Sequence, residues 1–279
     1  QHIARTGHEP REGPLAVGMV FLPKTDLAAQ ETCRTIVESE ILRFGYNIYG
    51  WRQVPVDPAV IGETANATRP EVEQIMIDNR KGGRDEKFER DLYIIRRRIE
   101  NAVLDAHIGD FYICSLSCNS LIYKGMFLAE QLTAFYPDLL DERFISSFAI
   151  FHQRYSTNTF PTWRLAQPFR MLAHNGEFNT IKGNTNWMKS HETRAVSEVF
   201  DEYNDEIFPL IEPDASDSMA LDSVVEALVH AGRPMPAAQC MVVPESWSHR
   251  PHMPQAHRDF FATLDGSIKV EPLERQPRK

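Results

Sequence analysis

The sequence is poor in cysteine, in long apolar runs and in positive charge. Its 279 residues include four cysteines, and the formal net charge is −9. A nucleic-acid binder needs a basic surface that displaces counterions, so this acidic balance argues against a nucleic-acid partner. The longest mostly apolar run, at residues 15–22, is far shorter than the roughly 20 residues that span a bilayer. No signal-peptide layout precedes it, and we expect a cytoplasmic protein that does not contact a membrane.

The four cysteines predict reduced, structural thiols. Cys114 and Cys118 are separated by three residues, and no second pair with zinc-ligand spacing follows. His249, His252 and His257 lie close together, but two prolines interrupt them and no helix face would collect all three. A polar loop is therefore favoured over a metal site, and we expect no bound metal.

A short basic run, Arg96–Arg98, stands inside a helical pattern. It is too short to indicate a nucleic-acid patch, since such patches need longer runs of Lys and Arg. We interpret it as the solvated face of a helix. The sequence also lacks the glycine-rich fingerprints of dinucleotide and phosphate binding, so nucleotide binding has no support.

The remaining composition is that of an ordinary globular protein, with 42% hydrophobic and 25% charged residues. Alternating or continuously apolar segments predict strands at residues 15–23, 46–56, 71–77, 111–117, 120–127, 144–156 and 169–175. Helical spacing predicts helices at residues 26–44, 85–106, 127–136, 179–196 and 217–232, with Asp26 as an N-cap and Gly45 as a stop. Strands occur in adjacent groups, which favours an α+β fold with antiparallel or mixed sheets covered by helices.

The segment RYSTNTFPTWRLAQPFRMLAHNGEFNT, residues 154–180, contains the candidate chemistry. Asn-Gly between two apolar runs is a strong hairpin signal, so HNGE by itself predicts a turn between strands. Arg154 alone is more often a structural residue, and Asp217, just before a predicted helix, is more often an N-cap. Together, however, these residues suit a free amino acid. The Arg154 guanidinium would pair with the carboxylate of the amino acid, and Asp217 would pair with its ammonium group. The Asn175 side chain and the Gly176 N–H would stabilise a developing oxyanion.

Several long segments resemble one family. They include ILRFGYNIYGWRQVP, YKGMFLAEQLTAFYPDLLDERF, the RYST-to-HNGE stretch with GNTNWMKSHE after it, and SDSMALD. Over roughly residues 14–261 the chain resembles the glutaminase domain of the glutamate synthase large subunit, a class II glutamine amidotransferase. The resemblance implies an N-terminal-nucleophile hydrolase fold, a four-layer αββα sandwich that is incomplete at its N-terminus.

The resemblance also implies a role for each candidate residue. Arg154 holds the glutamine α-carboxylate, with Tyr155 and Thr157 shaping that wall of the site. Asp217 holds the α-ammonium group. The oxyanion hole is formed by Asn175 and Gly176.

The family's nucleophile is the N-terminal Cys of the mature subunit, and none of the four cysteines here matches it. The sequence begins at Gln1, so we expect a piece of a longer polypeptide that is inactive in isolation. Its expected parts are a lead-in at residues 1–14, a partial amidotransferase domain at 15–261 and a divergent tail at 262–279. FMN and an iron–sulfur cluster are implied for the full-length enzyme, with no cofactor in this part. The implied partners are L-glutamine, the rest of the large subunit and a small electron-donating subunit.

A second hypothesis of another class stays open. Without a nucleophile, the same residues would suit a non-catalytic glutamine-binding or interaction module. A Cys at the processed N-terminus of the whole protein would favour the enzyme over this alternative.

Overall fold

The computed structural model describes residues 14–79, 82, 86–156, 159–175, 178, 180–243, 250 and 252–267. The chain divides into two compact units, which are described separately. Unit 1 comprises residues 1–155 and 159–174, and unit 2 comprises residues 156–158 and 175–279. The expected boundaries at residues 14 and 261 stay a prediction.

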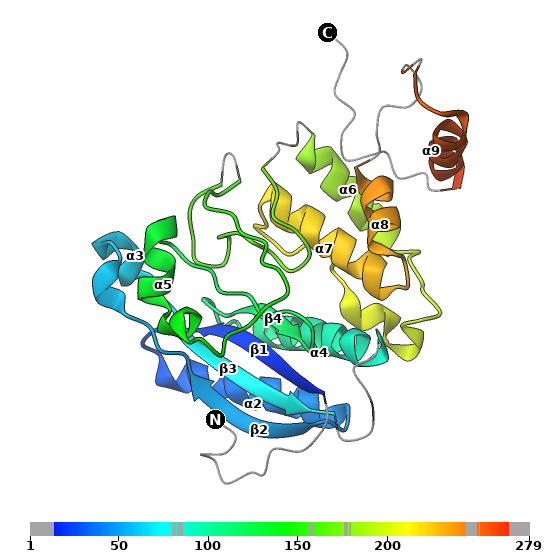
Figure 1. The fold of residues 1–279 in the computed structure, drawn as a ribbon. Coiled ribbons are helices and arrows are strands. Elements are labelled where there is room, and N and C mark those ends of the chain that lie inside the picture. The colour runs from blue at the N-terminus through cyan, green and yellow to red at the C-terminus, as the bar shows by residue number, and fades with distance from the viewer. Residues whose placement is uncertain are drawn as a thin grey trace. The chain divides into compact units, whose positions relative to one another are not determined.

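Unit 1 is built on a four-stranded sheet with the order β2-β3-β1-β4 (Figure 1). All three pairings are antiparallel. The strands are β1 (Leu15–Leu22), β2 (Asn47–Gln53), β3 (Glu71–Asp78) and β4 (Tyr112–Ser117). These four strands and the α+β class confirm the sequence predictions. The described residues form no second sheet, so the four-layer arrangement stays a prediction.

Two helices, α2 (Leu27–Arg43) and α4 (Glu86–Asp105), pack on the sheet of unit 1 (Figure 1). The shared core contains Val37 and Ile41 from α2, Leu92 and Ile95 from α4, and Ile75 from β3. Each is at most 1% exposed, as the helical spacing of the apolar residues predicts. As expected, Asp26 caps α2 by accepting the Ala29 N–H at 2.9 Å, and Gly45 follows the helix at φ +77°.

The other face of the sheet is covered by irregular chain and short helices. Phe21 of β1 makes an edge-on contact with Trp163, with ring centroids 6.0 Å apart. Phe135 and Tyr136 are fully buried nearby in the same aromatic cluster. The short elements of unit 1 are η1 (Pro58–Val60), α3 (Glu63–Ala67), η2 (Ala129–Gln131), α5 (Leu132–Phe135) and η3 (Pro137–Leu140).

The described part of unit 2 is helical. Its elements are α6 (Ile181–Glu192), η4 (Asp201–Ile207), α7 (Asp217–His230), α8 (Met235–Val242) and α9 (Gln255–Ser267). The predicted helices α6 and α7 are confirmed. The cap of α7 is Ser216, whose hydroxyl accepts the Met219 N–H at 3.2 Å. The N-cap interpretation of Asp217 is therefore wrong by one residue, and Asp217 is the first residue of the helix.

Three predicted strands, at residues 120–127, 144–156 and 169–175, do not form. Side chains take the backbone groups that a neighbouring strand would have used. The Ser115 hydroxyl accepts the Ile122 N–H at 3.3 Å, and Tyr136 donates to the Lys124 carbonyl at 2.9 Å. A strand is stable only where a partner pairs with its backbone N–H and C=O groups. Apolar patterning by itself does not guarantee such a partner.

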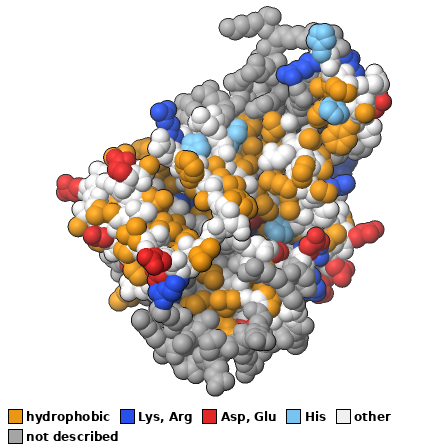
Figure 2. Space-filling model, in the orientation of Figure 1, with side chains coloured by type: hydrophobic (Ala, Val, Ile, Leu, Met, Phe, Trp, Pro, Cys, Tyr) orange, Lys and Arg blue, Asp and Glu red, His pale blue; other side chains and the backbone are white. Residues whose placement is uncertain are grey.

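The segment at residues 144–156 leaves apolar side chains in solvent. Ile145, Phe148 and Phe151 are 87%, 77% and 84% exposed. Figure 2 shows hydrophobic side chains widespread over the face that it draws. Large apolar side chains exposed together along one segment have the character of a surface that another part of a protein would cover.

The prediction that Arg96–Arg98 form a solvated helix face is wrong. Arg96 and Arg97 are each 2% exposed. Arg98 Nε lies 2.5 Å from Glu40 Oε2, which links α4 to α2. Acidic side chains of the same unit pair with all three arginines, which therefore offer no basic surface to nucleic acid.

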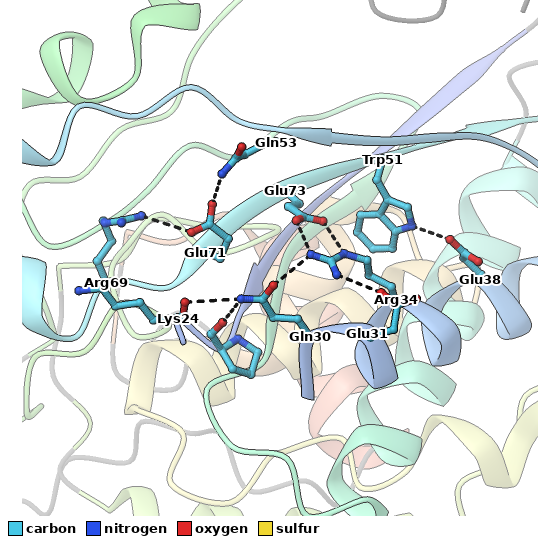
Figure 3. Close-up of polar contacts among 11 residues, drawn as sticks. Lys24, Gln30, Glu31, Arg34, Glu38, Trp51, Gln53, Arg69, Glu71 and Glu73 are labelled. Carbon is cyan, nitrogen blue, oxygen red and sulfur yellow. Dashed lines mark hydrogen bonds and ion pairs between the residues drawn. The ribbon is translucent and has the colours of Figure 1, made fainter. Parts of the chain in front are cut away.

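Polar contacts also join α2 to β3 in unit 1 (Figure 3). Arg34 makes a two-pronged ion pair with Glu73, with Nη2–Oε1 at 2.6 Å and Nε–Oε2 at 2.9 Å. Gln30 accepts from Arg34 Nη2 at 3.1 Å and donates to the Pro23 carbonyl at 2.7 Å. Every group in this network has a protein partner, so it holds the helix on the sheet and leaves no group available for a ligand.

Candidate functional site

Arg154 and Tyr155 lie near the end of the segment whose apolar side chains are exposed, residues 144–156. The Arg154 backbone N–H donates to His152 Nδ1 at 3.0 Å, while its side chain is exposed. That side chain makes no hydrogen bond or ion pair with a described residue, so its guanidinium is available to a carboxylate ligand. Tyr155 donates its hydroxyl to the Thr162 carbonyl at 2.9 Å. Burial raises the pKa of Tyr155, so its hydroxyl stays neutral, and its predicted role as a wall of the site stays a prediction.

The irregular chain at residues 163–174 leads directly to Asn175 and is held by side chains of unit 1. Gln167 exchanges two hydrogen bonds with the backbone of His174. Its Oε1 accepts the His174 N–H at 2.7 Å, and its Nε2 donates to the His174 carbonyl at 2.9 Å. Gln167 is 6% exposed. This amide takes the place of the strand partner that the sequence predicted for residues 169–175.

A second support is Lys124, which is 2% exposed. Its ammonium donates to the Arg164 carbonyl at 2.7 Å and lies over the rings of Tyr112 and Phe169, at 4.4 and 4.9 Å from their centroids. Contacts of this kind stabilise a cation away from water. The lysine therefore ties the start of the chain segment to the sheet.

Unit 1 contains a buried ionic cluster centred on Glu100. Arg96 and Arg97 each lie 2.6 Å from its carboxylate, and Arg170 Nη2 lies 3.0 Å from Oε1. Burial by itself raises the pKa of Glu100, but Arg96, Arg170 and Arg97 outweigh it and lower the pKa to about 2. Arg170 also donates to the Ile113 carbonyl at 2.6 Å, which fastens residues 163–174 to α4 and β4.

Asn175 and Asp217 belong to unit 2. Asn175 is exposed, and its side chain makes no hydrogen bond with a described residue. The Asp217 carboxylate accepts the Ser218 N–H at 2.6 Å at the start of α7, where the helix dipole stabilises an anion. It remains partly exposed, so an oxygen is left for a cationic ligand. No hydrogen bond joins these two residues within the part of unit 2 that the structure describes.

Of the six predicted site residues, Arg154 and Tyr155 belong to unit 1 and the other four to unit 2. Thr157 and Gly176 lie outside the described residues, as does His249. The convergence of the site on one ligand stays a prediction.

The cysteines are all reduced, and three of them are buried. Burial raises the pKa of Cys33 to about 11 and that of Cys114 to about 12, although nearby cations oppose the shift. Cys118 is 5% exposed, and Cys240 on α8 is half-buried. Since the thiolate is the reactive form, the buried thiols are unsuited to nucleophilic attack.

Within the described ranges, no group of three or more His, Cys, Asp and Glu side chains could hold a metal ion. The same ranges contain no helix whose length and hydropathy would let it cross a membrane.

Sequence reasoning missed Gln167, Lys124, Arg170 and Glu100. A buried Gln or Lys has no signature in composition or periodicity, and the RRR run was interpreted as solvent-facing. One usable signal was present: Lys124 and Arg170 stand among apolar neighbours in the sequence, where an unpaired charge would be costly.

Comparison with known proteins identifies the family. The model of the class-II glutamine amidotransferases matches residues 2–272. The chain is 62% identical over 257 residues to the glutamate synthase [NADPH] large chain of Azospirillum brasilense, which covers 92% of this chain and 17% of that protein. It is 46% identical over 260 residues to the chloroplastic ferredoxin-dependent glutamate synthase of Spinacia oleracea, covering 91% and 16%. It is 41% identical over 256 residues to the glutamate synthase [NADPH] large chain of Bacillus subtilis, covering 90% and 16%.

The chain thus spans about a sixth of the length of the relatives it matches. The family match, in contrast, extends over nearly all of its own residues. The chain therefore belongs to the class-II glutamine amidotransferases.

Proposed function

We propose that the chain is the glutamine-binding and oxyanion-stabilising part of the glutaminase domain of a glutamate synthase large chain. The observation that carries this proposal is the 62% identity to such a chain over 92% of the sequence. The available Arg154 guanidinium and the exposed Asn175 agree with it. In the longer protein, glutamine is hydrolysed to glutamate and ammonia, and the ammonia passes to 2-oxoglutarate to make a second glutamate.

In the proposed reaction, Arg154 binds the α-carboxylate of glutamine and Asp217 its α-ammonium group, with Tyr155 and Thr157 as the wall. A Cys thiolate attacks the side-chain carbonyl carbon and forms a C–S bond. The Asn175 amide and the Gly176 N–H stabilise the oxyanion. The C–N bond then breaks and ammonia leaves, after which water cleaves the thioester to release glutamate.

The attacking thiol is proposed to be an N-terminal Cys of the mature subunit. Burial keeps Cys33 and Cys114 protonated, which argues against either as nucleophile. The α-amine of an N-terminal Cys, with an ordinary pKa of about 7.7–8.0, is suited to accept the thiol proton.

We further propose that the complete domain is a four-layer αββα sandwich. The segment at residues 144–151, with Ile145 87% and Phe151 84% exposed, would form a strand of the second sheet once its neighbours cover it. Hydrogen exchange of the longer polypeptide tests this: slow exchange at residues 144–151 is expected, and fast exchange there would contradict the second sheet.

FMN and an iron–sulfur cluster are proposed to belong to other parts of the longer polypeptide. A cluster needs several cysteine thiolates in one place, and the four cysteines here form no such group. A small electron-donating subunit would then contact those other parts.

The function is tested with the longer polypeptide by measuring glutamate release from glutamine. Arg154→Ala should raise KM by about 10²-fold and leave kcat nearly unchanged, because loss of a charge-paired contact costs about 2–5 kcal/mol. Arg143→Ala is the matched control, since Arg143 is an exposed arginine of the same unit that pairs with Asp141. An unchanged KM for Arg154→Ala would refute the carboxylate role.

The alternative, a non-catalytic glutamine-binding or interaction module, predicts a different result. Wild-type protein would bind glutamine without releasing ammonia, and Arg154→Ala would weaken binding only. Ammonia release by the wild-type longer polypeptide would exclude this alternative.

A further inference from the structure

We propose that Gln167 is a positioning residue for the oxyanion hole, because it fixes the orientation of the peptide group that joins His174 to Asn175. This inference rests on the proposed glutaminase function. It concerns a side chain for which neither the sequence motifs nor the family match suggests a role.

The two hydrogen bonds of Gln167 restrain both peptide groups that flank His174. The His174 N–H belongs to the peptide before it, and Gln167 Oε1 accepts that proton at 2.7 Å. The His174 carbonyl belongs to the peptide shared with Asn175, and Gln167 Nε2 donates to it at 2.9 Å. With both planes fixed, the backbone torsions of His174 have little freedom. The direction in which the chain enters Asn175 is therefore set by one amide.

Gln167 can act in this way because its own surroundings are anchored. Lys124 donates to the carbonyl of Arg164, and Arg170 pairs with Glu100 and the Ile113 carbonyl. The Phe169 N–H also donates to the Leu172 carbonyl at 2.9 Å, which closes a turn around Arg170. Gln167 is itself 6% exposed, so water does not compete strongly for its two bonds.

The catalytic consequence follows from the demands of an oxyanion hole. Its donors stabilise the transition state only when they are already aimed at the position the oxyanion will occupy. A displacement of about 1 Å caused by a residue away from the chemistry can cost about 10²-fold in rate. Loss of the Gln167 bonds should therefore lower kcat. KM should change little, because the proposed carboxylate and ammonium contacts involve other residues.

A matched control exists in the same unit. Both polar atoms of the Gln131 side-chain amide also form hydrogen bonds with backbone groups. Its Oε1 accepts the Leu128 N–H at 2.7 Å, and its Nε2 donates to the Val60 carbonyl at 2.6 Å. The same substitution at Gln131 breaks a similar pair of side-chain-to-backbone hydrogen bonds, but this pair is not next to Asn175.

The test compares Gln167→Glu with Gln131→Glu in the longer polypeptide, with kcat and KM measured for glutamine hydrolysis. Glu keeps the acceptor but places a second oxygen against the backbone carbonyl, so each clamp loses its donor. We expect Gln167→Glu to lower kcat by about 10- to 10²-fold, with KM within about twofold, and Gln131→Glu to change neither. Amide exchange at His174 should accelerate in the first variant only.

Each outcome decides the matter. An unchanged kcat for Gln167→Glu, or an equal loss in both variants, would overturn the positioning role while leaving the glutaminase function intact. A wild-type protein that does not hydrolyse glutamine would overturn the proposed function and this inference together. Should Gln167→Glu fail to fold, Gln167→Asn takes its place, since its amide is one methylene too short to reach both His174 groups. The same kcat criterion then applies.

Discussion

Arg170 and Glu100, 70 residues apart in the sequence, form an ion pair in which Nη2 lies 3.0 Å from Oε1. Arg96 and Arg97 share the same carboxylate. The cluster joins α4 to the chain that leads to Asn175. It is buried, so its stability depends on all partners being present.

Glu100→Gln should destabilise unit 1 by about 3–5 kcal/mol, because removing one partner leaves buried charges uncompensated. The folded-state pKa of Glu100, about 2, lies below its ordinary value of 4.5. Its contribution to stability is therefore fully present above pH 4.5 and is lost as the pH falls towards 2. Urea unfolding at several pH values should show a smaller loss of stability between pH 4.5 and 2 in the variant. An identical pH dependence in both proteins would contradict the cluster.

Asn175→Ala should lower kcat for glutamine hydrolysis in the longer polypeptide by about 10²–10³, the usual cost of one oxyanion donor. KM should change little, since the ground-state carbonyl bears less charge than the oxyanion. Asn119→Ala is the control, because Asn119 is an exposed asparagine in unit 1. The oxyanion role fails if kcat survives in the Asn175 variant.

Alkylation by iodoacetamide should distinguish the cysteines. Cys240 is half-buried and should react at least about 10-fold faster at pH 8 than Cys33 and Cys114, because burial raises the pKa of both buried thiols and leaves little thiolate. Peptide mass spectrometry follows each site. Rapid labelling of Cys114 would contradict its burial.

The same four cysteines should not support catalysis. We expect the 279-residue chain to release no ammonia from glutamine, and Cys240→Ser to leave the longer polypeptide fully active. Ammonia production by the 279-residue chain, or loss of activity in Cys240→Ser, would reassign the nucleophile to a cysteine of this sequence.

Gly18→Ala should destabilise the sheet by about 1–3 kcal/mol, the usual cost of overpacking. A Cβ at Gly18 would lie 2.7 Å from Ile75 Cγ2 and 2.9 Å from Leu116 Cδ1, on the strands that flank β1. Gly109→Ala is the control, since a Cβ there meets nothing within 4 Å. Thermal unfolding should separate the two variants, and equal melting temperatures would refute the close approach.

Local sequence signals predicted the sheet and main helices of unit 1 well. Asp26 and Gly45 delimit α2, and strand-like apolar patterning gives β1, β3 and β4, because these features act over a few residues. The same patterning failed at residues 144–156 and 169–175. Whether a strand forms depends on a partner that satisfies its backbone, and at His174 that partner is the Gln167 side chain.

The sequence also predicted only part of the candidate site. Arg154, Asn175 and Asp217 were recognisable because their chemistry matches a free amino acid and their motifs resemble a family. The residues that hold the chain leading to Asn175 were not recognisable. Gln167, Lys124 and Glu100 gain their meaning from contacts with residues 7, 40 and 70 positions away in the sequence.

The sequence by itself determined the family and the α+β class, since these are written in local composition and motif, and it predicted which groups face a ligand. Only the tertiary structure decided that Arg96 and Arg97 are buried, that Ser216 caps α7, and that the Gln167 amide bonds the backbone of His174 where a strand was predicted. Burial and hydrogen-bond partnership arise when distant segments pack together, and a polar side chain becomes structural only when that packing removes its water.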